Sequence, residues 1–271
     1  MNRTNLSRKF LELIDIMKRL RDENGCPWDR KQTHDTLVPY LLEESYEAVG
    51  AIESLDWGGL AGELGDVLLQ ILFHARIAEE SNEFTMETVL DTLARKLIRR
   101  HPHVFGTATV DDAEEVLRNW QLIKRDEAKE CGARSVLDGL TSALPQLTYA
   151  QKSQERAAQV GFDWETTDQV KQKVREEWRE LWDSVEGSES PRRIEEEMGD
   201  LLFALVNLAR FLDVQPEEAL RKANLKFARR FREVERRAGG GDVMKTMRLE
   251  SLDAIWNDVK AAERNDAASG E

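Results

Sequence analysis

The sequence carries the same pattern of acidic residues twice, and this repeat limits what the chain can fold into. The first copy reads EESYE at residues 43–47 and ELGD at residues 63–66, and the second reads EEWRE at residues 176–180 and EMGD at residues 197–200. Residues three or four apart lie one above the other on a helix, so each cluster forms a ladder of carboxylates on one face. The repeat therefore predicts two pairs of helices whose acidic faces meet when each pair packs antiparallel.

Four or five carboxylates in one place repel one another unless a cation neutralises them. Both second clusters also run into apolar helix, where a carboxylate is costly unless it is paired or bound to a metal. A single acidic cluster is typical of a solvated helix face, but the matched repeat favours a site for Mg²⁺, with Mn²⁺ as an alternative. The predicted metal ligands are Glu177, Glu180, Glu197 and Asp200, and the corresponding secondary site in the first half comprises Glu43, Glu44, Glu47, Glu63 and Asp66.

The remaining sequence is typical of an all-α protein. Apolar residues recur at helical spacing over about 6–21, 86–100 and 216–237, and nothing alternates with the period of a strand for long enough to suggest a sheet. The second half repeats the order of elements in the first, which predicts tandem duplicated helical bundle domains. The pattern loosens between residues 131 and 144, so we expect domains at 1–132 and 133–271. Gly58-Gly59 is expected to end the first acidic helix, and residues 239–241 are expected to form a hinge.

Composition excludes several classes of partner. The 271 residues carry a net charge of −13, which disfavours nucleic acid and anionic membranes because both require a basic face. No signal peptide or membrane-spanning run is visible, and Cys26 and Cys131 lack metal spacing, so we expect a cytoplasmic protein without disulfides.

A pair of cations also repeats. Lys96 and Arg100 in the first half match Lys226 and Arg230 in the second, four residues apart on one helical face in each case. A basic pair on the helix that follows a carboxylate–metal site is what a triphosphate requires, because the metal bridges some phosphate oxygens and the cations neutralise the rest.

The two halves differ at two polar positions. Asn207 lies seven residues beyond Asp200, on the same helical face, whereas Phe73 occupies the matching position of the first half, and Asn224 is likewise replaced by Ala94. The first half therefore lacks two groups that could hydrogen-bond base, ribose or phosphate. We expect the second half to carry the main activity and the first half to serve as scaffold, regulator or secondary site.

At the acidic clusters the chain resembles the MazG family of nucleoside triphosphate pyrophosphohydrolases, within the all-α NTP pyrophosphatase superfamily. That family is marked by Glu-Glu-x-x-Glu followed after a loop by Glu-x-x-Asp, and the resemblance extends over nearly the whole chain, including GCPWD at residues 25–29. It implies a Mg²⁺-dependent hydrolase that attacks the α-phosphorus of NTPs or dNTPs, releases pyrophosphate and leaves the monophosphate, in nucleotide-pool housekeeping.

The chemistry of the site, the comparison of the two halves and the resemblance together indicate roles for individual residues. Glu176 would accept a proton from the attacking water or help to hold a second ion, and Lys226 and Arg230 would stabilise the departing charge. The residues expected to contact nucleotide are Arg193, Asn207, Asn224, Lys226, Arg230 and Trp256, and Lys96, Arg100 and Trp120 are their counterparts in the first half.

Of the other interpretations, two are excluded by the residues present and two stay open. A di-iron carboxylate bundle needs Glu-x-x-His, and no His follows a Glu at that spacing; no P-loop glycine motif occurs either. A non-enzymatic helical regulatory or interaction protein, with the acidic clusters as docking faces, is the alternative from another class. Within the enzyme class, a pyrophosphatase that is specific for deoxynucleotides also stays an open alternative. A homodimer is expected, because single bundles of this kind leave apolar helix faces uncovered.

Overall fold

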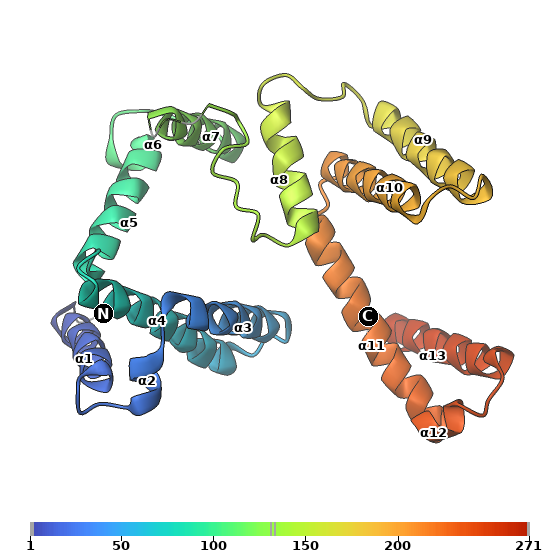
Figure 1. Cartoon of the computed structure of the whole chain (residues 1–271), viewed down its shortest axis with the longest axis horizontal. Helices are drawn as coiled ribbons and strands as arrows, with labels where there is room; N and C mark the ends of the chain where they lie inside the picture. Colours follow the sequence, from blue (N-terminus) through green and yellow to red (C-terminus); the bar gives the residue numbers. More distant parts are fainter. Residues whose placement is uncertain (1–2, 131, 133, 270–271) are drawn as a thin grey trace. The chain divides into compact units, whose positions relative to one another are not determined.

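The computed structural model describes residues 3–130, 132 and 134–269, and every regular element in that part of the chain is a helix (Figure 1). The all-α prediction is confirmed. The chain divides into two compact units, Met1–Lys124 and Arg125–Glu271. The domain boundary expected between residues 132 and 133 stays a prediction, and Cys131, on one side of it, lies outside the described residues. None of the described helices combines the length and apolar character needed to cross a membrane.

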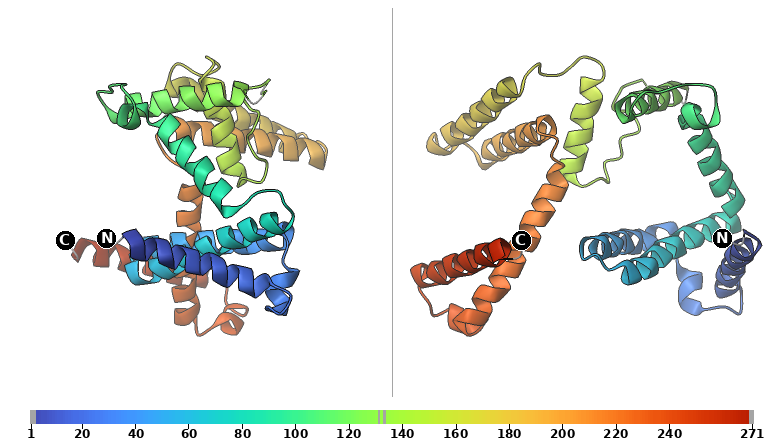
Figure 2. Two further views of the ribbon diagram at one scale, coloured as in Figure 1. Left: turned by 90° about the vertical axis from the view of Figure 1, so that its left-hand side faces the viewer. Right: turned by 180° about the vertical axis from the view of Figure 1, so that it is seen from behind.

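The first unit is built on the hairpin of α3 and α4, which lie side by side along their length (Figure 2). α1 and α5 pack against α4. The helices that begin in this unit are α1 (Arg3–Arg21), α2 (Pro27–Lys31), α3 (His34–Glu53), α4 (Trp57–Glu80), α5 (Met86–Arg100), α6 (Pro102–Phe105) and α7 (Ala113–Glu130).

The ends of α3 and α4 follow from local capping. The Thr33 hydroxyl accepts a hydrogen bond from the backbone N–H of Thr36, and the Thr36 hydroxyl accepts one from the backbone N–H of Thr33, so α3 begins with a capping box. The expectation that Gly58-Gly59 ends this helix is wrong. α3 ends at Glu53, and Asp56 caps α4 by accepting a 2.9 Å hydrogen bond from the Gly59 N–H. Both glycines therefore lie in the first turn of α4.

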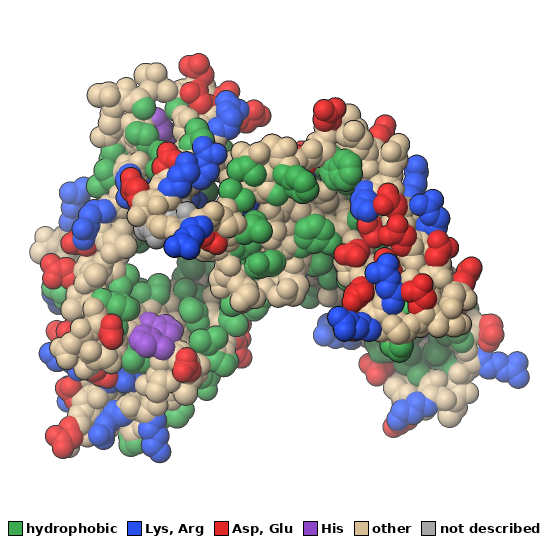
Figure 3. Space-filling view, turned by 45° about the horizontal axis from the view of Figure 1, so that its top comes forward, with side chains coloured by type: hydrophobic (Ala, Val, Ile, Leu, Met, Phe, Trp, Pro, Cys, Tyr) green, Lys and Arg blue, Asp and Glu red, His purple; other side chains and the backbone are tan. Residues whose placement is uncertain are grey.

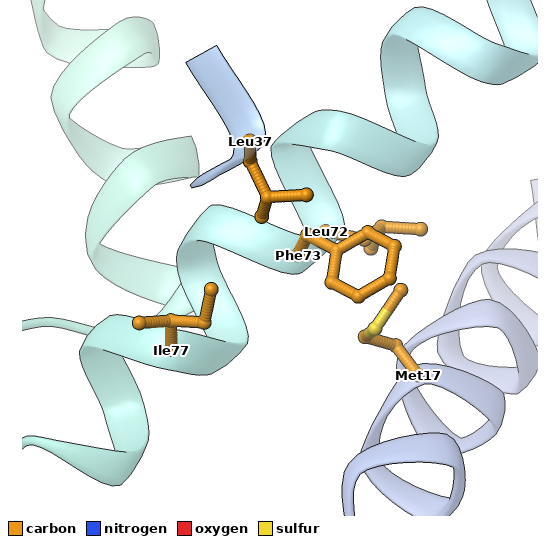
Figure 4. Packing of buried hydrophobic residues seen from close by; sticks show 5 residues of the cluster. All are labelled: Met17, Leu37, Leu72, Phe73 and Ile77. Carbon is orange, nitrogen blue, oxygen red and sulfur yellow. The ribbon is translucent and has the colours of Figure 1, made fainter. Parts of the chain in front are cut away.

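The core of the first unit joins α1, α3 and α4. Its buried side chains are Met17, Leu37, Leu72, Phe73 and Ile77, and Figure 4 shows the first four gathered together, with Ile77 to one side. Burial of a side chain of this size contributes about 1.5–3 kcal/mol. This packing sets the register of α3 on α4, and with it the relative positions of the acidic residues on the two helices.

The second unit repeats the hairpin as α9 and α10, with α8 packed on α10 and α13 packed on α11. Thr166 forms a capping box at α9, and the Ser190 side chain accepts from the N–H of Arg193 at α10. Gly239, with a φ of 92°, closes α11, and Gly241 begins the next short helix, so the expected hinge is a helix stop followed by a turn. The helices are α8 (Gln146–Ala158), α9 (Thr167–Glu186), α10 (Pro191–Phe211), α11 (Pro216–Ala238), α12 (Gly241–Met244) and α13 (Leu249–Ser269).

Candidate active site

The α9–α10 hairpin brings the carboxylates of the second half together. One oxygen from each of Glu177, Glu197 and Asp200 lies within 4.8 Å of the others, and Glu176, Glu177 and Glu180 form a second such group. Glu177 belongs to both groups. Glu177 is 6% exposed and Glu197 is 1% exposed, so two carboxylates lie inside the hairpin. All four predicted metal ligands therefore gather in one place.

Burial and neighbouring charges both act on the pKa of Glu197, the most deeply buried carboxyl of this cluster. Burial raises the pKa of the Glu197 carboxyl, the Arg193 guanidinium lowers it, and the negative charges of Glu180, Asp200 and Glu177 raise it further, with a net upward shift. A cluster of acceptor-only carboxylates, two of them buried and all under mutual repulsion, is suited to a hard divalent cation, which offsets both the desolvation cost and the repulsion. The residues present therefore fit a divalent metal.

Two cations of the chain pair with these carboxylates. The Lys173 ammonium lies 2.7 Å from Glu176 and 2.6 Å from Glu177, and Arg193 pairs with Glu197. The hydrogen bonds to Glu176 and Glu177 raise the pKa of Lys173, and Lys173 in turn lowers the pKa of Glu176. Sequence reasoning missed Lys173. Its position one turn before the acidic motif, at three and four residues from Glu176 and Glu177, is the signal that could have found it.

The first half has a weaker version of the same arrangement. Oxygens of Glu44, Glu47 and Glu63 lie within 4.8 Å of one another. Burial is the main cause of the raised pKa of Glu44, and the neighbouring charges of Asp66, Glu47, Glu43 and Glu63 add to it. The pKa of Glu63 is likewise raised, first by burial and then by Glu47.

The counterparts of the two cations are missing from the first half. Four residues before Glu44 stands Tyr40, where the second half has Lys173, and four residues before Glu63 stands Gly59, where the second half has Arg193. The first-half carboxylates therefore lack the built-in positive charges that the second half carries at these two positions.

The arginine of each predicted cation pair lies beside a tryptophan. Arg230 on α11 donates a 2.7 Å hydrogen bond to Glu263 on α13, and its guanidinium lies 6.0 Å from the ring centre of Trp256. In the first half, the Arg100 guanidinium lies 5.4 Å from the ring of Trp120. Within the described part of the chain, the ion pair of Arg230 is with α13 and not with the carboxylates of α9 or α10. Lys226 and Asn224 lie on the same helix as Arg230.

The two positions that distinguish the halves have different surroundings. Phe73 is 3% exposed in the first core and meets Trp28 edge to face, with ring centres 6.4 Å apart. Asn207 is half-buried, and its Oδ1 accepts hydrogen bonds of 3.1 and 2.8 Å from Arg210. The first half thus uses this position for packing, and the second half presents a polar group there.

The fold and the paired carboxylate clusters define a class of duplicated all-α proteins with an acidic cluster on each helical hairpin. The family model for the MazG nucleotide pyrophosphohydrolase domain matches residues 32–105 and 165–234, once in each half, and the chain belongs to this family. Both matches include the acidic hairpins.

Curated relatives extend over nearly the whole chain. The nucleoside triphosphate pyrophosphohydrolase of Escherichia coli K12 is 48% identical over 254 residues, which cover 93% of this chain and 97% of that protein. The nucleoside triphosphate pyrophosphohydrolase/pyrophosphatase MazG of Thermotoga maritima is 46% identical over 255 residues, 94% of this chain and 96% of the relative. An uncharacterized protein of Bacillus subtilis, YabN, is 45% identical over 260 residues, which cover 96% of this chain and 53% of YabN.

Proposed function

We propose that this protein is a Mg²⁺-dependent nucleoside triphosphate pyrophosphohydrolase that cleaves the bond between the α- and β-phosphates and leaves a monophosphate and pyrophosphate. The observation that carries the proposal is the cluster of Glu177, Glu197 and Asp200, two of them buried, with oxygens within 4.8 Å, inside a segment that matches the family model. The names of the relatives support the same activity and weigh against a purely regulatory helical protein.

The four carboxylates of Glu177, Glu180, Glu197 and Asp200 would hold the ion. When bound, the ion polarises phosphate oxygens and lowers the pKa of a coordinated water. Glu176 lies beside this group, and Lys173 lowers its pKa, so it is ionised at neutral pH and able to accept a proton from the attacking water.

Cationic side chains of the second half would hold the triphosphate. Arg193 stands in the first turn of α10, where the helix N-terminus also favours an anion. Lys226 and Arg230 would neutralise the departing pyrophosphate. Asn224 and Trp256 complete the set of nucleotide contacts that we propose. The pairing of Arg230 with Glu263 on α13 keeps this arginine beside Trp256.

The proposal is tested by product analysis with a panel of NTPs and dNTPs. We expect monophosphate and pyrophosphate in the presence of Mg²⁺ or Mn²⁺ and no turnover in excess EDTA, because acceptor-only carboxylates cannot bind an anionic triphosphate without a cation. Diphosphate and free phosphate as primary products would mean attack at the γ-phosphorus. Undiminished turnover in EDTA would contradict a metal-dependent mechanism.

We also propose that the protein forms a homodimer. Figure 3 shows hydrophobic side chains gathered on the surface. Exposed apolar residues follow α5, α10 and α11, and they include Leu90, Leu93, Leu97, Leu202, Phe203, Leu205, Leu225, Phe227 and Phe231. Apolar helix faces of this extent are typical of surfaces that a second copy covers. Sedimentation equilibrium would measure the mass in solution, and a monomer at micromolar concentration would contradict this proposal.

A further inference from the structure

Three functional positions of α10 lie on one stripe of the helix. Arg193, Asp200 and Asn207 are spaced by seven residues, so they share a face, and successive members stand about 10 Å apart along the axis. The stripe presents a cation at the helix N-terminus, then the carboxylate cluster, then an amide. This order matches the parts of a metal-bound nucleoside triphosphate, with the phosphate tail at Arg193 and the metal at the carboxylates. The nucleoside then extends toward Asn207.

The amide of Asn207 is held in one orientation. Both hydrogen bonds that its Oδ1 accepts come from Arg210, which is donor-only, so the oxygen must face the guanidinium and the Nδ2 must face away. Among the residues that the structure describes, none accepts a hydrogen bond from this Nδ2. The amide therefore presents a donor whose direction is set by its neighbour.

Arg210 is itself fixed by a residue distant in sequence. Its Nη1 donates a 2.9 Å hydrogen bond to Asp163 Oδ2 and its Nη2 donates a 2.5 Å hydrogen bond to the other oxygen, a forked pair across the loop before α9. The Arg210 side chain is 16% exposed and that of Asp163 is 28% exposed, so solvent weakens this pair only in part. The forked geometry restricts the rotation of the guanidinium and keeps Nε and Nη2 aimed at Asn207.

The first half retains the arginine without this arrangement. Arg76 stands three residues beyond Phe73, as Arg210 stands three beyond Asn207. It pairs with Glu79 at 2.9 Å and Glu80 at 3.0 Å on its own helix, and more distantly, at 4.0 Å, with Asp22 just after α1. The network of Asp163, Arg210 and Asn207 is therefore particular to the second half.

We propose that Asn207 donates a hydrogen bond from Nδ2 to an acceptor on the nucleoside part of the substrate, and that Arg210 and Asp163 are positioning residues that orient this donor. The acceptor belongs to the sugar or to the base. This inference rests on the proposed function. It states how the same site would recognise the nucleoside, which is the part of the substrate that does not react.

Steady-state kinetics of three variants test the inference. Asn207→Asp keeps the shape and the acceptor for Arg210 but replaces the donor by an acceptor, so we expect KM for ATP to rise about tenfold with kcat within about twofold. Arg210→Gln frees the amide to turn and should raise KM by about threefold, and Arg210→Lys should recover part of that loss by donating to Oδ1. The double variant Asn207→Asp/Arg210→Gln should have the KM of Asn207→Asp alone, because Arg210 acts through Asn207.

Comparison of substrates identifies the acceptor. A changed preference for ATP over dATP in Asn207→Asp places the acceptor on the ribose hydroxyl, and a changed preference among ATP, GTP and CTP places it on the base. Arg76→Gln is the matched control from the first half and should leave KM unchanged, with helicity checked by circular dichroism.

Two results would overturn the inference and leave the proposed function standing. An unchanged KM in Asn207→Asp would show that the donor is unused. Multiplying effects in the double variant would show that Arg210 does not act through Asn207. Failure of the wild-type protein to release pyrophosphate from any nucleotide would instead overturn the proposed function itself.

Discussion

At the scale of single residues, matched positions of the two halves serve different purposes. Asn207 faces a polar network where Phe73 fills a core, and Lys173 pairs with carboxylates where the first half has Tyr40. The shared acidic motif does not reveal such differences, because it consists only of the positions at which the two halves have the same residue type. We expect these differences to decide which half recognises a nucleotide.

A histidine pair in the first unit provides a pH-dependent contact between α3 and α4. The Nδ1 atoms of His34 and His74 are 2.7 Å apart, while the parallel rings have centres 5.0 Å apart, so the nitrogens face each other edge to edge and share one proton. Burial lowers the pKa of His74, and the charge of His34 lowers it further.

This pair predicts a loss of stability in mild acid. Because the pKa of His74 is lower in the folded protein than its usual 6.5, its contribution is fully present above that value and is lost as the pH falls below it. We expect the melting temperature to fall between about pH 7 and pH 5. His74→Phe should reduce this fall, as measured by thermal circular dichroism. An equal fall in the variant would assign the pH dependence to other groups.

At the scale of the elements, helix ends follow closely from local signals. The caps at Thr33, Thr166 and Ser190 place three helix starts where hydroxyl side chains satisfy free backbone N–H groups. A glycine in the sequence predicts a helix end less directly, because glycine occurs both at the start and at the end of a helix. Gly59 lies in the first turn of α4, and Gly239 caps the end of α11.

We expect substitution by alanine to have opposite effects on stability at two glycines of α4. A Cβ at Gly59 would stand 2.5 Å from Asp56 Oδ2, so Gly59→Ala should disturb the cap and destabilise the protein by about 1 kcal/mol. Gly62 has open space at its Cβ and lies in the helix, so Gly62→Ala should stabilise by about 0.5–1 kcal/mol. Urea unfolding monitored at 222 nm compares the two. Stabilisation by Gly59→Ala would show that the Asp56 cap moves without cost.

At the scale of the whole molecule, the duplication supplies two hairpins with acidic clusters. The second has Arg193, Lys173 and the Asn207 network around its carboxylates, and the first has neither cation at the matched positions. We therefore expect one working site and one that serves a structural, regulatory or secondary role.

Removal of single carboxylates tests this inequality. Glu177→Ala and Asp200→Ala should abolish most turnover, because metal positioning and charge neutralisation fail together. Glu44→Ala and Asp66→Ala, their matched controls, should keep much of the wild-type rate. Steady-state pyrophosphate release compares the pairs, with folding checked by circular dichroism. Inactive first-half variants would mean that the halves are reversed, and a loss of about half in each pair would mean that both sites work.

The sequence by itself determined the helices, the two acidic ladders and the family, because helical spacing and capping depend on residues only a few positions apart. The sequence also predicted that the four candidate metal ligands lie on one helical hairpin. Only the tertiary structure decided that Phe73 enters a core, that Arg230 pairs with Glu263, and that Arg210 joins Asp163 to Asn207. These contacts depend on which helix faces pack together, and packing is set by burial over the whole unit, which no short stretch of sequence records.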